Sequence, residues 1–386
     1  MLQTWFENVA ECVIILGIMD KQTCTTKTLS VRVRDKHAAL LRQWAFEVNQ
    51  VWNAANAESG ELSWVPVPGV GWMNFGTSAF DLQRELKRVK AERSLSIGDS
   101  TYQEVIAVHA KSRKQFKTNK LRWRSSGGAK RALGWVPFKI RAAQWRDGQV
   151  KFNGHFFKVW DSYGLSQYKF RSGSFSEDSR GRWYFNVVVE APVTQTEKTS
   201  AVGIDLGLKD YATCSDGTRL EAKQHYRHLE SKLGIAQRAG NKKQVRTIHA
   251  KIKNRRKDAL HKFSRELVNN HGAIVIGNVS SSKLARTKMA KSVLDAGWFM
   301  LKTQLQYKAI GHGVWFKEVN EAYSTQTCSC CGCIPASSPK GRAGLGVRSW
   351  ECSDCGASLD RDVNAATNIL NFGLGYQAPV DGIPGL

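Results

Sequence analysis

The stretch "SAVGIDLGLKDYATCSDG" (residues 200–217) is the clearest indication of the fold of the C-terminal half of this 386-residue chain. Its first apolar run, "AVGID", predicts a buried strand that ends on Asp205, and "DYATC" predicts a second strand after a tight turn. A further apolar run, "AIVIGNV" (273–279), predicts another buried strand. An acid at the tip of a buried strand is a candidate active-site residue, although many α/β proteins have one for structural reasons alone.

Helical and extended segments alternate around these strands. Apolar residues recur at three- and four-residue steps within residues 221–270, and this helical pattern breaks near 239–243. We expect a helix at 292–313, a strand at 314–327, a cysteine-rich insertion and a closing helix at 359–375. Strands and helices in this order predict an α/β sheet like that of ribonuclease H.

The N-terminal half has a different pattern. "KTLSVRVR" (27–34) alternates like a half-buried strand, and residues 36–125 carry helical periodicity with a basic outer face. Short alternating runs separated by turn residues fill 126–197, and we expect them to form a small β-barrel to which residues 27–35 return. Polar residues 194–200 are a candidate linker, and residues 1–26 a candidate extension that results from an upstream start codon. The predicted fold class is multidomain α+β.

The formal net charge of +24 is the dominant global property, with 57 Lys and Arg against 33 Asp and Glu. A field of this sign attracts polyanions, and aromatic side chains that can stack on bases are interleaved with the charges. We therefore predict a nucleic-acid partner; a basic solvated surface, a ribosomal protein or a membrane-surface protein is the alternative. No apolar run reaches the roughly 18 residues of a membrane span, and we expect a bacterial cytoplasmic protein at the nucleoid.

Six of the nine cysteines lie within residues 328–355, where they include two CxxC pairs. Glycine follows each pair, as a tight knuckle requires, and four thiolates from two knuckles form the closed tetrahedral site of structural zinc. A set of accidental free thiols is the alternative. The predicted zinc ligands are Cys328, Cys331, Cys352 and Cys355, which leaves Cys330 and Cys333 spare.

"LDRDVNAATNI" (359–369) supplies a second candidate acid at the start of the closing helix. The helix dipole and free N–H groups at that end favour a carboxylate at Asp362, whereas Asp360 is a candidate helix cap. Two-metal phosphodiesterases need several such carboxylates to converge on paired Mg²⁺ ions.

Three segments together resemble a known family: "GIDLGLKDYATCSDG", "YSTQTCSCCG" and "ECSDCGASLDRDVNAATNIL" are similar to the RuvC-like nuclease motifs and inserted zinc ribbon of TnpB proteins. These are RNA-guided nucleases of bacterial insertion sequences, related to type V CRISPR effectors. The resemblance is dense over 200–372 and only architectural over 27–197. It implies a wedge barrel (27–35 and 126–197) with an inserted recognition module (36–125), a nuclease domain (198–327 and 356–386) and a zinc ribbon (328–355).

The resemblance also implies an Asp–Glu–Asp set that works with two Mg²⁺ ions. Asp205 matches the first aspartate and Asp362 the last, but the place of the glutamate, at the end of "AIVIGNV", holds Gly277. Nuclease activity is then lost, or the acid has moved to a neighbouring strand. Strand 314–327 would run parallel beside 273–279, about 4.8 Å away, so Glu321 is within reach of the gap left by Gly277. Glu318, at an odd offset from Glu321, would face the opposite side of the sheet.

We favour relocation to Glu321, with a surface acid paired to lysine as its alternative role. The predicted function is Mg²⁺-dependent cleavage of double-stranded DNA, directed by a guide RNA and a short flanking motif. A nuclease-dead RNA-guided repressor is the second reading, and a transposase or resolvase that acts without RNA is the third. The sequence leaves open whether one or two protomers bind each RNA.

Overall fold

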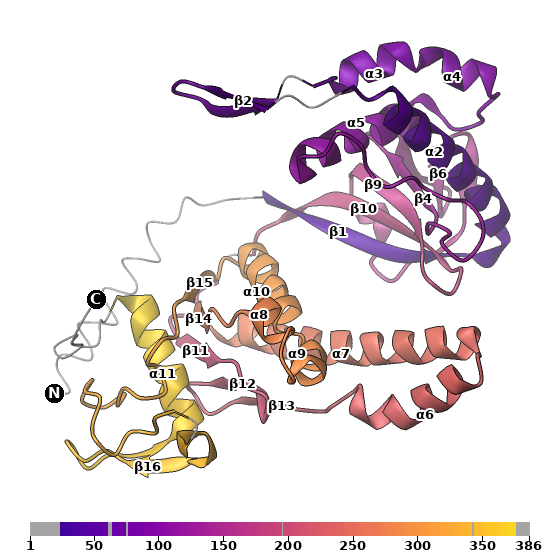
Figure 1. Cartoon of the computed structure of the whole chain (residues 1–386). Coiled ribbons are helices and arrows are strands. Elements are labelled where there is room, and N and C mark those ends of the chain that lie inside the picture. Colours follow the sequence, from indigo (N-terminus) through magenta and orange to yellow (C-terminus); the bar gives the residue numbers. More distant parts are fainter. Residues whose placement is uncertain (1–23, 61–63, 75, 195, 342, 376–386) are drawn as a thin grey trace. The chain divides into compact units, whose positions relative to one another are not determined.

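The computed structural model describes residues 24–60, 64–74, 76–194, 196–341 and 343–375. The chain divides into two compact units (Figure 1): an N-terminal unit, Thr26–Ala191, and a C-terminal unit formed mainly by the residues from Pro192 onward. Most of the predicted extension, residues 1–23, lies outside the described residues. Within the described ranges, no helix combines the length and apolar character needed to cross a bilayer.

The C-terminal unit is built on a five-stranded sheet with the order β13-β12-β11-β14-β15. The strands β11, β14 and β15 are parallel, whereas β12 pairs antiparallel with β11 and β13 pairs antiparallel with β12. Their bounds are β11 Ala201–Asp205, β12 Asp210–Cys214, β13 Arg219–Glu221, β14 Ala273–Gly277 and β15 Trp315–Val319. This mixed α/β sheet agrees with the element order predicted from the sequence.

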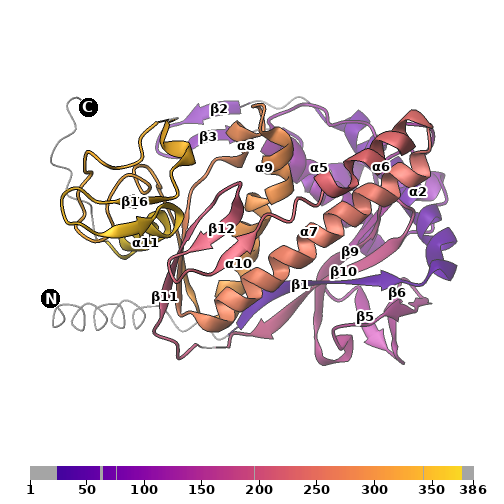
Figure 2. The ribbon, with the colours of Figure 1, turned by 90° about the horizontal axis from the view of Figure 1, so that it is seen from below.

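Helices cover both faces of this sheet. The helices are α6 Arg227–Arg238, α7 Lys242–Asn270, α8 Ser281–Leu284, α9 Ala290–Ala296, α10 Trp298–His312 and α11 Arg361–Leu374. Ile274 and Ile276 of β14 pack in one core with side chains of α7 and α10. Val275 faces the other way and packs with Ile369 of α11. Figure 2 shows α6 and α7 as an antiparallel hairpin.

Two predicted elements of this unit differ in the structure. The helix expected at 292–313 is broken at Gly297, whose φ of +71° separates α9 from α10. The strand expected at 314–327 ends at Val319, so Glu321 lies in the turn that follows it. Both differences arise at short local breaks that apolar periodicity does not reveal.

The N-terminal unit does not form the predicted closed barrel: its described strands pair in separate sheets. One sheet has the order β4-β9-β10-β1-β8 and another the order β5-β6-β7. Aromatic side chains, among them Phe138, Phe152 and Phe175, fill a common core. The strands are β1 Cys24–Val33, β4 Trp135–Phe138, β5 Ala143–Arg146, β6 Gln149–Phe152, β7 His155–Phe157, β8 Val159–Trp160, β9 Phe170–Glu177 and β10 Trp183–Pro192.

The helical module of this unit contains α2 Ala38–Glu58, α3 Ala79–Glu85, α4 Lys87–Glu92 and α5 Asp99–Phe116. A hairpin that the sequence analysis missed, β2 Trp64–Val67 and β3 Gly71–Asn74, lies between α2 and α3. The helical pattern predicted for residues 36–125 stops short of its end, because α5 ends at Phe116, where Lys117 adopts a left-handed conformation with a φ of 48°. Residues 120–126 contain no helix.

Candidate active site

The carboxyl ends of β11, β14 and β15 meet at one edge of the sheet. Ile204 pairs with Ile276 and Gly277 with Val319, so Asp205, at the end of β11, lies one step beyond the last β11–β14 pair. A β-carbon at Gly203 would lie 2.8 Å from the backbone N of Leu370, which shows that this residue faces α11. Since side chains alternate along a strand, Asp205 points to the same α11 face.

Glu321 reaches this edge from the turn after β15 and fills the space beside Gly277. A β-carbon at position 277 would clash with Oε2 of Glu321 and would lie 3.2 Å from its Cβ and 3.3 Å from Cδ1 of Ile369. Glycine at position 277 therefore leaves room for the carboxylate in this position, and a larger residue would require the Glu321 side chain to shift. The structure places Glu321 in the position expected from the sequence.

Glu318 lies on the other side of the sheet. Its Oε1 is 2.6 Å from Nζ of Lys302 on α10, and Lys302 also donates to the carbonyl of Val279. The lysine pairing considered for Glu321 is thus made by Glu318. Glu318 thus lies on the α10 side of the sheet, whereas Glu321, from the turn beyond β15, lies beside Gly277 and Ile369 of α11.

Burial and mutual repulsion raise the proton affinity of the carboxylates at this edge. Burial, then the charges of Glu321 and Asp362, raise the pKa of Asp205 to about 7, against the opposing effect of Arg361. Burial also raises the pKa of Glu321, while Lys302 lowers it and Glu318 raises it. A site that penalises its own negative charges in this way is suited to bind cations.

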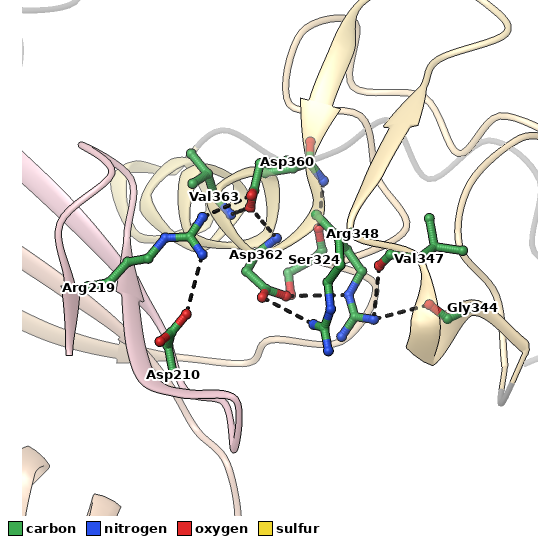
Figure 3. Close-up of polar contacts among 11 residues, drawn as sticks. Asp210, Arg219, Ser324, Gly344, Val347, Arg348, Asp360, Asp362 and Val363 are labelled. Carbon is green, nitrogen blue, oxygen red and sulfur yellow. Dashed lines mark hydrogen bonds and ion pairs between the residues drawn. The ribbon is translucent and has the colours of Figure 1, made fainter. Parts of the chain in front are cut away.

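Asp362 lies in the first turn of α11, where arginines surround its carboxylate (Figure 3). Its oxygens are 3.4 Å from a guanidinium nitrogen of Arg348 and 3.4 Å from Nε of Arg361. Asp360 caps the helix by accepting from the backbone N–H groups of Asp362 and Val363, at 3.0 Å each. Asp360 is therefore a helix cap, as the sequence predicts.

A third arginine joins the start of α11 to the sheet. Arg219 of β13 donates to Asp360 at 2.8 Å and to Asp210 of β12 at 3.3 Å (Figure 3). This bridge fixes the N-terminus of α11 against the antiparallel edge of the sheet. Arg348 belongs to the cysteine-rich insertion, so that insertion also contacts the candidate site.

Two asparagines that the sequence analysis missed hold the turn carrying Glu321. Nδ2 of Asn368 donates to the carbonyls of Ser324 at 2.8 Å and Thr327 at 2.7 Å. Asn364 donates to Thr327 at 2.8 Å and accepts from the backbone N–H of Ser329 at 2.8 Å. Both asparagines are buried and lie four residues apart on α11, a spacing that the sequence does display.

The residues at this edge fit a divalent cation. Oε2 of Glu321 is buried and has no hydrogen-bond partner among the described residues, so a cation would satisfy an atom that is otherwise costly to bury. Carboxylate oxygens are the ligands that Mg²⁺ prefers.

The four cysteines predicted to bind zinc do form one cluster. The Sγ atoms of Cys328 and Cys355 are 3.7 Å apart, and those of Cys331 and Cys352 are 3.8 Å apart. Sulfurs about 2.3 Å from a central zinc ion stand about 3.8 Å apart in a regular tetrahedron. The spare Cys330 and Cys333 are exposed and lie outside the cluster.

The two cysteine knuckles have the same backbone geometry. Gly332 N–H donates to the carbonyl of Cys328 and Gly356 N–H to that of Cys352, both at 2.8 Å. The two glycines have φ angles of +77° and +71°, which other residues rarely adopt. The second knuckle is flanked by the short strands β16 Ser349–Glu351 and β17 Ser358–Asp360, which lead directly into α11.

Comparison with known families locates the same segments. Residues 184–288 match the OrfB_IS605 family, described as "Probable transposase". Residues 298–369 match the family described as "Cas12f1-like, TNB domain". The matched residues include α10, Glu321 and the cysteine cluster. The predicted resemblance to the TnpB family is confirmed over these residues.

Individual proteins agree with the families. The chain is 36% identical over 223 residues to a "Putative RNA-guided DNA endonuclease" of Streptomyces pristinaespiralis, covering 54% of each chain. It is 31% identical over 225 residues to "Putative RNA-guided DNA endonuclease InsQ" of Escherichia coli K12, covering 50% of this chain and 55% of that one. The alignments thus span about half the length of these curated relatives.

A solved structure extends the similarity in fold to most of the chain. The protein in a structure of a Cas12f1–sgRNA–target DNA complex superposes with a TM-score of 0.56 at 13% identity. The superposition covers 90% of this chain and 99% of that chain. At this level of identity the similarity concerns the fold.

Proposed function

We propose that this chain, whose C-terminal half resembles the TnpB family, is an RNA-guided DNA endonuclease. In this proposal, a guide RNA pairs with one strand of a double-stranded target, and the protein recognises a short flanking motif. The charge of +24 supports a polyanionic partner. The names of the relatives and the Cas12f1 complex support the same function. The site of action would be the bacterial nucleoid.

One observation carries the nuclease assignment: the carboxylate of Glu321 fills the space beside Gly277, at the edge where Asp205 ends β11. A protein that only bound DNA would have no chemical need to bring buried carboxylates together there. The buried Oε2 of Glu321 and the raised pKa of Asp205 both indicate a position that gains from a cation. We therefore assign Asp205, Glu321 and Asp362 as the catalytic carboxylates.

In a RuvC-like phosphodiesterase, the carboxylates and the residues around them would have separate roles. Two bound Mg²⁺ ions would supply the activation of water and the stabilisation of the leaving oxygen. Asp205, Glu321 and Asp362 would hold them, and the asparagines of α11 would keep the turn of Glu321 in place. Arg348 and Arg361, which neutralise Asp362 in the structure, lie where they can also contact a phosphate.

The cysteine cluster is proposed to bind one structural zinc ion. Its four thiolates would leave no open coordination position, which excludes a catalytic role for that metal. The ion would brace the insertion that supplies Arg348 and that begins where Asn364 contacts Ser329. The N-terminal unit is proposed to supply the wedge (27–35 and 126–197) and the recognition module (36–125).

To test the function, the full chain is expressed together with the flanking transposon sequence, the protein is purified, and the RNA that copurifies is sequenced. We expect one discrete RNA species and Mg²⁺-dependent cleavage of a plasmid matched to its guide. A protein that carries no discrete RNA would contradict the guided function. A nuclease-dead repressor, the second candidate, would instead bind the matched plasmid without cutting it.

A further inference from the structure

The segment after α5 forms a feature that the nuclease assignment does not use. Residues 120–126, "KLRWRSS", contain three basic residues, one tryptophan and no acid. We call this segment the basic strap. It crosses α2 in an irregular conformation, in the place where sequence periodicity had predicted the end of a helix.

Asparagines on one face of α2 hold the strap. Asn53 pairs with the backbone of Arg124, accepting from its N–H at 2.8 Å and donating to its carbonyl at 2.9 Å. Asn56 pairs in the same way with Leu121, at 2.8 and 2.9 Å. Two side-chain amides thus imitate the pairing of a neighbouring strand and satisfy the strap backbone.

Two further residues of α2 also hold the strap. Asn49 accepts from Nε of Arg124 at 2.6 Å and donates to Ser126 at 2.9 Å. Nε1 of Trp52 donates to the carbonyl of Arg122 at 3.2 Å. The four α2 residues, Asn49, Trp52, Asn53 and Asn56, recur at helical spacing, so they share one face.

These contacts leave a specific set of side chains exposed. Trp123 keeps 55% of its surface exposed, and Lys120 and Arg122 are also exposed. Neither Lys120 nor Arg122 forms an ion pair within the described ranges. By contrast, the Arg124 guanidinium is held between Trp52 and Trp135, 5.6 Å from each ring. The inward arginine is held by the fold, whereas no hydrogen bond, ion pair or ring contact within the described residues holds the outward side chains.

We propose that the basic strap is a binding site for single-stranded nucleic acid, an inference that rests on the proposed RNA-guided function. Lys120 and Arg122 contact phosphates, and the exposed indole of Trp123 stacks on an unpaired base. A rigid aromatic platform between cations is the arrangement that binds single strands with little sequence preference. An internal base pair in a duplex has no free face for the indole.

The asparagine pairs explain why the site is pre-formed. A free loop of this composition would lose backbone entropy on binding, whereas the strap is already ordered by its contacts with α2. Asn53 therefore acts as a positioning residue: among the described residues its side-chain hydrogen bonds go to the strap backbone, and its removal leaves every charge and the indole present.

The test uses the full chain, freed of copurified RNA by high salt, with labelled rU20, dT20 and a 20-bp duplex. Fluorescence anisotropy at several salt concentrations gives Kd. We expect Trp123→Ala to weaken single-strand binding roughly tenfold, and duplex binding by less than about twofold. Arg122→Ala should lower the slope of log K against log salt by about 1.

Two further variants separate the strap from general effects. Trp72→Ala removes a tryptophan that is 66% exposed on a hairpin without basic residues and should leave binding unchanged. Asn53→Ala should weaken single-strand binding severalfold while circular dichroism stays native. Stronger dependence on Trp123 with rU20 than with dT20 would identify the bound strand as RNA, and the reverse would identify DNA.

Single-strand binding by Trp123→Ala at wild-type affinity would overturn the strap proposal, as would an equal loss in Trp72→Ala. Either result leaves the RNA-guided function intact if the wild-type protein still cuts its matched plasmid. A wild-type protein that binds none of the three probes would instead contradict the proposed function itself.

Discussion

The carboxylate of Glu321 occupies the space that a β-carbon at position 277 would need. Gly277 ends β14, in the centre of the parallel strands, and Glu321 follows β15. The absence of an acid at the end of β14 and the presence of one beyond β15 are therefore a single steric arrangement. This coupling makes both positions open to direct tests.

Gly277→Ala should destabilise the protein by about 1–3 kcal/mol, because the new methyl group overlaps the Glu321 side chain. Urea unfolding without divalent cations measures this. In a Glu321→Ala background the cost should shrink by at least about 0.5 kcal/mol, the coupling expected of residues in contact. Gly311→Ala is the matched control, since a β-carbon there meets open space within α10. Additive effects at 277 and 321 would show that the residues do not touch.

Asp205→Asn should change how stability depends on pH. The folded pKa of Asp205, about 7, lies above its ordinary value of 3.8, so the folded protein retains a proton that the unfolded chain releases. Below about pH 4 the Asp205 carboxyl therefore does not lower the free energy of unfolding. Between about pH 4 and about pH 7 it lowers that free energy progressively. In EDTA at pH 8, Asp205→Asn should raise Tm by about 5 °C, with little change at pH 4.

The same variant should remove the response to cations. Added Mg²⁺ should raise the Tm of the wild-type protein by mass action and leave that of Asp205→Asn nearly unchanged. The assignment of Asp205 would be contradicted if the Tm of the two proteins changed in parallel across pH 4–8 and rose equally when Mg²⁺ was added.

Much of the C-terminal unit was predictable because its signals are local. The apolar runs of β11 and β14 and the helical repeat of residues 221–270 all appear in the sequence as regular periods. The relation of Glu321 to Gly277 was predictable for a further reason: parallel neighbouring strands bring their carboxyl ends together.

The parts that escaped prediction depend on contacts between distant residues. Nothing local shows that residues 120–126 leave the helix, because their conformation is set by Asn53 and Asn56 some 70 positions earlier. Asn364 and Asn368 likewise act on carbonyls about 40 positions away. The open sheets of the N-terminal unit differ from the predicted barrel because closure depends on which edge strands pair, and alternation does not specify this.

Asn368→Ala should destabilise the C-terminal unit by about 1–3 kcal/mol, because the carbonyls of Ser324 and Thr327 lose a buried donor. The turn carrying Glu321 should loosen, which faster amide hydrogen exchange over residues 321–327 would report. Thr367→Ala removes a hydroxyl that bonds only within α11, to Val363, and serves as the control. Equal effects of the two substitutions would show that the asparagine has no special role.

Zinc should bind with a stoichiometry of one ion per chain, and Cys352→Ser should abolish it. Metal analysis by mass spectrometry measures this directly. Cys330→Ser and Cys333→Ser should retain the ion, since both side chains lie outside the cluster. Chelation should lower the apparent stability of residues 328–360 first, because this small insertion has little apolar core of its own. Retained zinc in Cys352→Ser would contradict the ligand set.

The role of Glu321 as the catalytic acid is tested by cleavage of a guide-matched plasmid with Mg²⁺, using four proteins: wild type, Glu318→Ala, Glu321→Ala and the double variant Gly277→Glu/Glu321→Ala. We expect cutting by wild type and Glu318→Ala and none by Glu321→Ala. We also expect recovered cutting by the double variant, in which the acid returns to the end of β14. Cleavage by Glu321→Ala at the rate of the wild-type protein would contradict the catalytic role of Glu321.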